Sequence, residues 1–155
     1  MPEDIRPPDK AVQGTSFVDG YLLYLLASVS HHVSGQFHAH VREQGVRVPE
    51  WRVLATLHGE DGAMITTLAR ISLLEQSHLT KIVDQMAQRG LVTRRPDPED
   101  ARRVRVFLSD EGRALAMRLV EDARAHEAEV MGRLSDEESA ALKSVLQKML
   151  ARLEA

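Results

Sequence analysis

Hydrophobic residues recur every three or four positions along most of this chain, which is the spacing of one face of an α-helix. Residues 1–14 lack this spacing and contain three prolines, which interrupt helices, so we expect them to form a flexible arm. The runs that show the spacing cover residues 16–42, 49–58, 65–71, 76–88, 110–133 and 136–153. The pattern predicts a mainly helical fold with long helices at both ends.

One segment departs from the helical spacing and alternates in the manner of β-strands. Residues 91–95 and 103–108 form two such stretches, and the turn-forming residues 96–101 separate them. The apolar residues that share one face of the second stretch are Val104, Val106 and Leu108. We therefore expect a small β-hairpin between two helices.

The last helical run carries an unbroken apolar stripe. Its members are Leu142, Val145, Leu146, Met149, Leu150 and Leu153. A chain of 155 residues has little interior in which to bury this stripe together with those of the other long helices. A twofold-symmetric dimer would bury them, and a monomeric helical bundle is the alternative.

The composition excludes several classes of protein. There is no cysteine, which excludes disulfides, thiolate metal ligands and a cysteine nucleophile. The longest apolar run, residues 21–27, is far short of the roughly 20 residues that span a bilayer. We therefore expect a single cytoplasmic domain, with no membrane partner and no cofactor. A nucleophile elbow, a glycine-rich phosphate loop and an HExxH motif are all missing from the sequence, so an enzyme is not expected.

Positive charge is concentrated in one part of an acidic chain. Residues 77–105 contain seven Lys or Arg against four Asp or Glu, whereas the whole chain has a formal net charge of −3. A basic helix followed by a basic hairpin suits double-stranded DNA, because a helix fits the major groove and a hairpin can follow the adjacent backbone. A charged hairpin that contacts only solvent is the alternative.

The helices expected at 65–71 and 76–88 are separated by a short turn, as in a helix-turn-helix, whose second helix reads base edges with its N-terminal residues. In this chain those residues are Gln76, Ser77, His78, Thr80 and Lys81. The hairpin adds Arg94, Arg95, Arg102, Arg103 and Arg105. Their planar guanidinium groups suit phosphates and narrow minor grooves. We predict that both sets contact DNA.

The hairpin resembles the wing of the multiple antibiotic resistance regulator (MarR) family. That wing carries Asp-x-Arg-x-x-x-Val-x-Leu followed by Thr or Ser, and residues 100–109 read Asp-Ala-Arg-Arg-Val-Arg-Val-Phe-Leu-Ser. Asp-Glu-Gly-Arg follows, as in the family, and the resemblance extends from about Gly20 to Leu153. It implies a mainly α winged helix-turn-helix fold in a single domain, 1–155. The helix-turn-helix lobe would be 49–109, and the dimerisation helices 16–45 and 110–155.

The resemblance also implies roles for single residues. Asp100 would orient the wing by pairing with a nearby arginine, and Arg102 would reach the minor groove from the wing tip. The protein would be a homodimer and a ligand-responsive repressor, bound to a pseudo-palindromic operator. Two positions depart from the family pattern. Leu73 occupies a turn position that is often glycine, and Met64 stands where Ser or Thr usually caps the short helix, which makes Thr66 the candidate cap for a later start.

The effector implied by the family is a small aromatic or phenolic acid. It would be held where the first, second and fifth helices meet the DNA-binding lobe. The candidate residues are Tyr21, Tyr24, Ser28, His31, His32, Arg47, Trp51 and Arg52. Two histidines and two tyrosines near a tryptophan and two arginines could hold an aromatic anion such as a carboxylate. The aromatic residues could equally belong to the core, and the paired histidines to the surface or to an interface.

Two other functions remain open. A metal-responsive regulator would use some of the seven histidines, although His38 and His40 point apart on a helix, so its ligands would come from different helices. The other candidates are His31, His32 and His126. A winged-helix module that contacts other partners without reading DNA is the second alternative. We assign no metal ligands.

Overall fold

The computed structural model describes residues 16–155, which belong to two compact units. The first ends at Gln36 and the second comprises Phe37–Ala155. The expected flexible arm, residues 1–14, lies outside the described residues. In the described part of the chain, no helix is both long enough and apolar enough to cross a membrane.

The first unit is helical, with a break that the sequence pattern does not predict. Helix α1 covers Phe17–Gly20 and helix α2 covers Leu22–Glu43, where the spacing predicts a single helix. The last residues of α2, from Phe37 on, belong to the second unit. The backbone N–H of Ser16 donates to the carboxylate of Asp19 at 3.1 Å and starts α1. Tyr21 is extended, with φ −79° and ψ 117°. The apolar spacing continues across Tyr21, so periodicity alone could not reveal the break.

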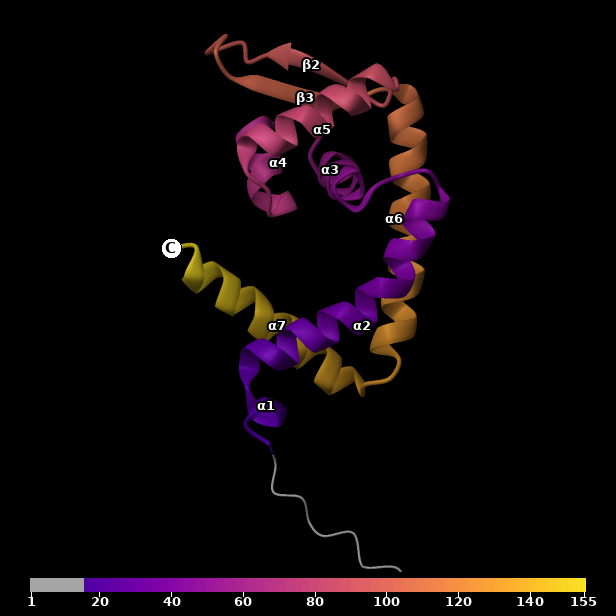
Figure 1. Ribbon diagram of the computed structural model, residues 1–155, viewed down its shortest axis with the longest axis vertical. Helices are drawn as coiled ribbons and strands as arrows, with labels where there is room; N and C mark the ends of the chain where they lie inside the picture. The colour runs from indigo at the N-terminus through magenta and orange to yellow at the C-terminus, as the bar shows by residue number, and fades with distance from the viewer. Residues whose placement is uncertain (1–15) are drawn as a thin grey trace, which may run out of the picture. The chain divides into compact units, whose positions relative to one another are not determined.

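The second unit contains the helix-turn-helix, the hairpin and two long helices (Figure 1). After α2, its elements are α3 (Val48–Gly59), β1 (Ala63–Met64), α4 (Ile65–Ser72), α5 (Gln76–Gln88), β2 (Val92–Pro96), β3 (Val104–Leu108), α6 (Asp110–Met131) and α7 (Asp136–Leu153). Apart from β1, this order was predicted, and the ends agree to within about two residues. The mainly α fold with a small hairpin is confirmed.

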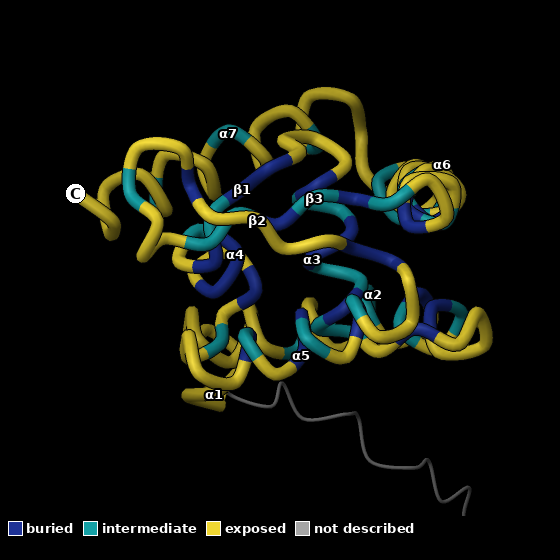
Figure 2. Tube along the Cα trace, turned by 90° about the horizontal axis from the view of Figure 1, so that it is seen from above, coloured by how far each residue is buried: buried dark blue, intermediate teal, exposed yellow. Residues whose placement is uncertain are grey.

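Helix α3 is the centre of this unit and packs against α4, α5, α6 and β3. Its residues Val53, Leu54 and Leu57 are fully buried, and Figure 2 shows dark blue along this helix. The residues of α5 that the spacing assigns to the core are all buried: Leu79, Ile82, Val83 and Met86. Each buried side chain of this size contributes about 1.5–3 kcal/mol. The apolar face of α5 therefore holds this helix on α3 and leaves its polar face to solvent.

The hairpin is part of a three-stranded antiparallel sheet with strand order β1–β3–β2. Val92 of β2 pairs with Leu108 of β3, and Ala63 of β1 pairs with Val106. Val106 and Leu108 are buried, as the alternation predicts. Strand β1 was not predicted, because two residues are too few to show an alternating pattern.

Two contacts fix the base of the hairpin to the start of α6. One carboxylate oxygen of Asp61 accepts from the backbone N–H of Leu108 at 2.9 Å, and the other from the guanidinium of Arg113 at 2.8 Å. Gly112 lies against the carbonyl of Leu91, and a Cβ at Gly112 would be 1.9 Å from that oxygen. Only glycine permits this approach, so the hairpin and α6 keep a fixed spacing.

Helix α7 leaves its apolar stripe exposed. Met149 is half-buried, and the exposed members are Leu142, Val145, Leu146, Leu150 and Leu153. The tube of α7 in Figure 2 is mostly in the colour of exposed residues. The second unit by itself thus does not bury this stripe.

Candidate nucleic-acid interface

The turn between α4 and α5 depends on a leucine in the left-handed region. Leu73 has φ 57° and ψ 41°, and its N–H donates to the carbonyl of Arg70 at 3.2 Å. The N–H of Leu74 donates to Ala69 at 3.0 Å, which ends α4. A residue with a Cβ pays roughly 1–2 kcal/mol in this region, and glycine avoids that penalty. Leu73 occupies the turn position that is often glycine in the family, and its backbone adopts a conformation that favours glycine. Its leucine side chain is 79% exposed.

Helix α4 begins at Ile65, directly after Met64, whose side chain makes no capping hydrogen bond. The expected later start, capped by Thr66, is therefore wrong. Strand β1 explains the difference, because Met64 pairs with Arg105 of β3 and this pairing fixes the backbone just before the helix. Thr66 is instead an exposed residue of the first turn of α4.

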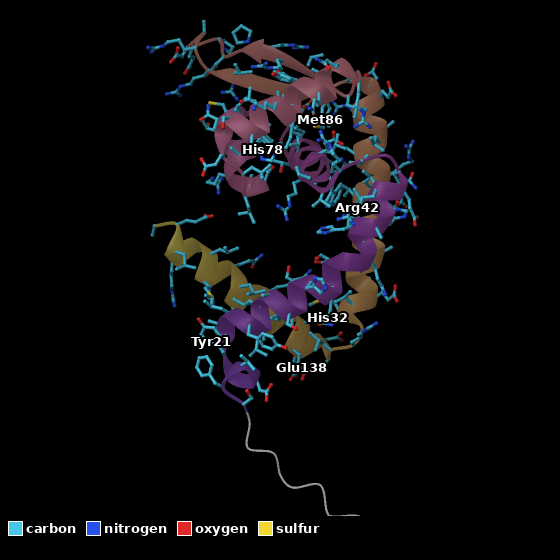
Figure 3. The ribbon with its side chains drawn as sticks, in the orientation of Figure 1. Tyr21, His32, Arg42, His78, Met86 and Glu138 are labelled. Carbon is cyan, nitrogen blue, oxygen red and sulfur yellow. The ribbon has the colours of Figure 1, made fainter. Side chains whose placement is uncertain are left out.

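The N-terminal half of α5 presents polar side chains to solvent. The exposed residues of this half are Gln76, Ser77, His78 and Lys81. Thr80 is half-buried, and its hydroxyl donates to the carbonyl of Gln76 at 2.9 Å. Figure 3 labels His78 in this half of the helix and the buried Met86 in the other half. Amide, imidazole, hydroxyl and ammonium groups thus share the solvent face of α5, and these are the groups that bind bases and phosphates.

The tip of the wing is organised by Asp100. Its Oδ1 accepts from the backbone N–H and from Nε of Arg102, both at 3.1 Å, and Oδ2 accepts from Nη2 at 3.3 Å. Nε of Arg103 lies 3.7 Å from Oδ2. The side-chain hydrogen bonds from Arg102, then its backbone N–H and the charge of Arg103, hold the pKa of Asp100 below its ordinary 3.8. Arg102 is nevertheless 91% exposed, so its guanidinium projects from the tip in a fixed orientation.

A second wing aspartate, Asp97, was not singled out from the sequence. It is buried, and its carboxylate accepts from Nε of Arg105 at 3.3 Å. Nη1 of Arg105 donates to the carbonyl of Gly62 at 3.0 Å, and the N–H of Asp97 donates to the carbonyl of Arg103 at 2.9 Å. Arg105, predicted as a DNA contact, therefore holds the hairpin to the turn before β1.

Arg94 and Arg95 also have partners within the lobe. Arg94 forms an ion pair with Asp84 of α5 and remains 36% exposed. The guanidinium carbon of Arg95 lies 4.6 Å from the centre of the Phe107 ring, a cation–π contact. The same ring covers Gly62, where φ is 80° and a Cβ would be 2.7 Å from the ring. These contacts stiffen the hairpin behind its tip.

A cavity of about 480 Å³ lies between the helix-turn-helix and the hairpin. The predicted DNA contacts that line it are Gln76, Thr80, Arg94, Arg102 and Arg103. Thr66, which was not predicted as a contact, lines it as well. The other predicted contacts lie outside this lining: Ser77, His78, Lys81, Arg95, Asp100 and Arg105. Three arginines in a concave surface beside a polar helix face can hold a phosphate backbone.

The chain resembles known proteins in both sequence and fold. The sequence model of the MarR family matches residues 46–104, which cover most of the helix-turn-helix lobe and hairpin. A solved MarR-family transcriptional regulator from Silicibacter pomeroyi DSS-3 is 56% identical, with a TM-score of 0.81, over 90% of this chain and 99% of the other. The chain belongs to the MarR family. The resemblance and the winged helix-turn-helix fold inferred from the sequence are thereby confirmed.

Further relatives support the assignment of the chain to the MarR family. A second MarR-family regulator structure, from Silicibacter pomeroyi, is 30% identical with a TM-score of 0.77, over 87% of this chain and 91% of the other. An HTH-type transcriptional repressor from Mycobacterium tuberculosis is 28% identical over 130 residues, which are 84% of this chain and 91% of the repressor. Members of the family bind DNA and act as dimers. The chain is a MarR-family transcriptional regulator and not an enzyme.

The residues predicted for a MarR-type effector pocket are divided between the two units. Tyr21, Tyr24, Ser28, His31 and His32 belong to the first, and Arg47, Trp51 and Arg52 to the second. In the first unit, Tyr21 stacks on Phe17 with ring centres 4.9 Å apart, and Nδ1 of His32 hydrogen-bonds to the carbonyl of Ser28 at 2.8 Å.

The second-unit candidates have protein partners. Trp51 packs edge-on against Phe37 with ring centres 5.2 Å apart. Nη1 of Arg52 donates to the carbonyl of Ser72 at 2.9 Å, and Nη2 of Arg47 donates to Glu50 at 2.9 Å. The two arginines therefore support the turn after α4 and the start of α3. The effector pocket stays a prediction.

The histidines considered for metal binding have other contacts. Nε2 of His40 hydrogen-bonds to Oδ2 of Asp122 at 2.7 Å. Burial and then the charge of Arg52 lower the pKa of His38 from its ordinary 6.5. Within residues 16–155, no group of three or more His, Asp or Glu is placed to hold a metal ion.

Proposed function

We propose that this MarR-family regulator is a dimeric repressor that binds a pseudo-palindromic operator. Each α5 would lie in a major groove, and each wing would place Arg102 in the neighbouring minor groove. The observation that carries the proposal is the Asp100–Arg102 pair: a carboxylate, whose pKa the hydrogen bonds from Arg102 lower, holds an exposed guanidinium beside the polar face of α5.

The contacts divide into two kinds. Gln76 and His78 can exchange hydrogen bonds with base edges and would determine sequence preference. Lys81 and Arg103 would bind phosphates, which fix the register of the protein and make binding sensitive to salt. Arg95 and Arg105 would act mainly through the stiffness of the hairpin, since each has a partner within the lobe and neither lines the cavity. Arg94 pairs with Asp84 and also lines the cavity, so it would contribute both to stiffness and to phosphate binding.

The dimer would form through the exposed apolar faces of the terminal helices. In the first unit the exposed residues include Phe17, Leu22, Leu23, Leu26 and Val29, and in the second they are those of the α7 stripe. Burial of such a side chain contributes about 1.5–3 kcal/mol, so a symmetric partner is strongly favourable. The symmetry would set two recognition helices about 34 Å apart, one turn of DNA.

Selection of bound duplexes from randomised DNA, followed by footprinting, tests this function. We expect two inverted half-sites with centres about one helical turn apart and an affinity that falls steeply with salt. Recovery of no preferred sequence would instead support an interaction module that keeps the winged fold without reading DNA.

A small aromatic or phenolic acid is the proposed effector that releases the repressor. Titration of the selected complex with benzoic, hydroxybenzoic and phenylacetic acids should release DNA with one or more of them. Tyr24→Phe and His31→Ala should reduce this response without changing DNA affinity. Release by divalent metal ions, reversed by a chelator, would favour the metal-responsive alternative.

A further inference from the structure

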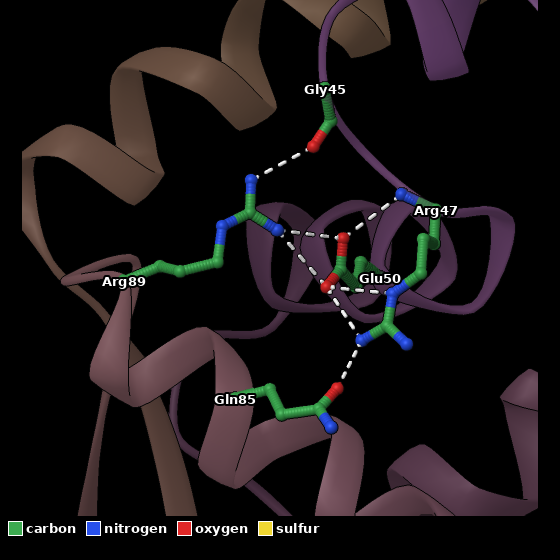
Figure 4. A network of polar contacts seen from close by, with 5 residues as sticks. All are labelled: Gly45, Arg47, Glu50, Gln85 and Arg89. Carbon is green, nitrogen blue, oxygen red and sulfur yellow. Dashed lines mark hydrogen bonds and ion pairs between the residues drawn. The ribbon is translucent and has the colours of Figure 1, made fainter.

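Glu50 is a carboxylate in the core of the DNA-binding lobe, 1% exposed. An unpaired charge at this depth would be very unfavourable, and Figure 4 shows guanidinium groups on both sides of it. Arg47 donates to Oε2 from its backbone N–H and to Oε1 from Nη2, both at 2.9 Å. Nη1 of Arg89 donates to Oε1 at 3.1 Å and to Oε2 at 3.0 Å. Each carboxylate oxygen therefore accepts at least two hydrogen bonds.

The two arginines connect this carboxylate to the recognition helix. Arg89 is the C-terminal cap of α5, and its Nη2 also donates to the carbonyl of Gly45 in the loop before α3 at 2.8 Å. Arg47 hydrogen-bonds to Gln85, one turn earlier on α5. We call these five residues the Glu50 clamp: Gly45, Arg47, Glu50, Gln85 and Arg89. The clamp joins the C-terminal end of α5 to α3 and to the loop that precedes it.

The clamp is at the opposite end of α5 from the residues that face DNA. Residues 76–88 span about 18 Å at 1.5 Å per residue. A tilt of about 5° at the clamped end would displace the first turn by about 1.5 Å, more than the tolerance of a hydrogen bond. The buried apolar face of α5 resists separation from α3, but apolar packing is not directional and controls tilt less strictly.

We propose that Glu50 and Arg89 are positioning residues for DNA recognition. They set the tilt of α5 on α3, so that Gln76 and His78 meet base edges while the wing reaches the adjacent groove. This inference rests on the proposed DNA-binding function. Glu50 itself does not contact DNA, and it acts only through the orientation of α5.

Charge and geometry predict opposite results for Glu50→Gln. Removal of a negative charge from the DNA-binding lobe would strengthen binding to any duplex if electrostatics alone decided affinity. If the clamp positions α5, the same change weakens binding to the selected operator, because glutamine cannot hold both guanidinium groups as a carboxylate does. Binding to random duplex, which needs no exact register with base edges, changes less.

The test compares a duplex selected by the wild-type protein with a randomised duplex of equal length. For Glu50→Gln and for Arg89→Lys we expect the ratio of the two affinities to fall about tenfold, comparable to the loss of one good base contact. Arg89→Lys keeps the charge, so the salt dependence of random-duplex binding should stay unchanged. Glu121→Gln, an exposed carboxylate of α6, is the matched control and should keep the wild-type ratio.

Thermal unfolding followed by circular dichroism establishes that each variant is folded. If Glu50→Gln does not fold, Arg89→Lys still provides the comparison, because lysine retains one donor for Glu50. If the folded variants keep the wild-type ratio of operator affinity to random-duplex affinity, the positioning role is overturned. The proposed DNA-binding function would still stand. A wild-type protein that selects no sequence would overturn both.

Discussion

Asp100 and Arg102 form a closed local unit at the tip of the wing, because the backbone N–H and the guanidinium of Arg102 both donate to the same carboxylate. The hairpin backbone therefore sets where the guanidinium points. Fixing an arginine side chain removes up to about 2 kcal/mol of rotamer entropy. Because Asp100 already restricts the side chain of Arg102, part of this entropy is lost before DNA binds. Less entropy is then lost on binding, which favours the complex.

Arg102→Ala should weaken operator binding by about 1–3 kcal/mol, the value of one good arginine contact. The thermal stability of the protein should not change, because the side chain is 91% exposed. A gel-shift titration on the selected operator measures the effect, with Arg133→Ala, an exposed arginine outside the lobe, as the control. Equal affinities for the wild type and Arg102→Ala would remove the wing tip from the interface.

Asp100→Asn should also weaken operator binding, although it removes a negative charge close to the DNA. The hydrogen bonds from Arg102 keep the pKa of Asp100 below its ordinary value, so the native residue is ionised at neutral pH. An amide offers one acceptor oxygen and releases the guanidinium from its fixed orientation. In a double-mutant cycle, Asp100→Asn should add little to Arg102→Ala. Additive losses would show that Asp100 acts independently of Arg102.

Leu73→Gly should stabilise the protein by about 0.5–1 kcal/mol. Glycine relieves the Cβ of a left-handed residue, a gain of roughly 1–2 kcal/mol, and part of this is offset by the greater entropy of glycine in the unfolded chain. Little burial is lost, because the leucine is 79% exposed. Chemical unfolding at fixed protein concentration measures the difference. Leu73→Ala keeps the Cβ and should therefore not stabilise the protein. Equal stabilisation by Leu73→Gly and Leu73→Ala would show that relief of the left-handed backbone is not the cause.

Glu50 should make stability depend on pH in the acid range. Burial raises its pKa, but the hydrogen bonds from Arg47 and the charges of Arg47 and Arg89 outweigh burial, so the pKa lies below its ordinary 4.5. A carboxyl with a lowered pKa in the folded state contributes stability above pH 4.5 and loses it as the pH falls through the folded-state pKa.

We therefore expect Glu50→Gln to lower the free energy of unfolding by about 1–3 kcal/mol at neutral pH. The difference from the wild type should shrink as the pH falls below 4.5. Urea unfolding of both proteins from about pH 7 to about pH 3 measures it. A difference that stays constant over that range would assign the effect to packing and not to ionisation.

The helices could be predicted because each keeps its apolar residues at one spacing, and those that this spacing assigns to the core of α5 are all buried. The exposed polar residues in the N-terminal half of α5 could be predicted because they lie outside the apolar face of this helix. The errors about the elements have local causes, and the unpredicted strand β1 also explains why α4 begins at Ile65 and not after Thr66. The apolar spacing runs through the extended Tyr21, and strand β1 is only two residues long.

The partners of the charged residues could not be predicted from spacing. Arg105 is one of the predicted DNA contacts, and it also donates to the carbonyl of Gly62, 43 positions earlier, which only the fold brings close. Glu50 and Arg89 are 39 positions apart and meet because α5 packs on α3. Sequence spacing identifies the arginine-rich hairpin, but it does not distinguish arginines that hold the hairpin from those that project from it.

The stripe of α7 provides the test of assembly. Leu146→Asp combined with Leu150→Asp places two charges in the proposed dimer interface, where each would lose its hydration and the apolar contact it replaces. We expect monomers in sedimentation velocity at micromolar concentration and loss of operator binding, since one recognition helix alone cannot occupy both half-sites. Gln147→Asp with Ala151→Asp adds the same charges on the opposite, exposed face of α7 and should leave the dimer intact. A double Leu variant that sediments as a dimer, or a wild type that is monomeric with and without DNA, would contradict this architecture.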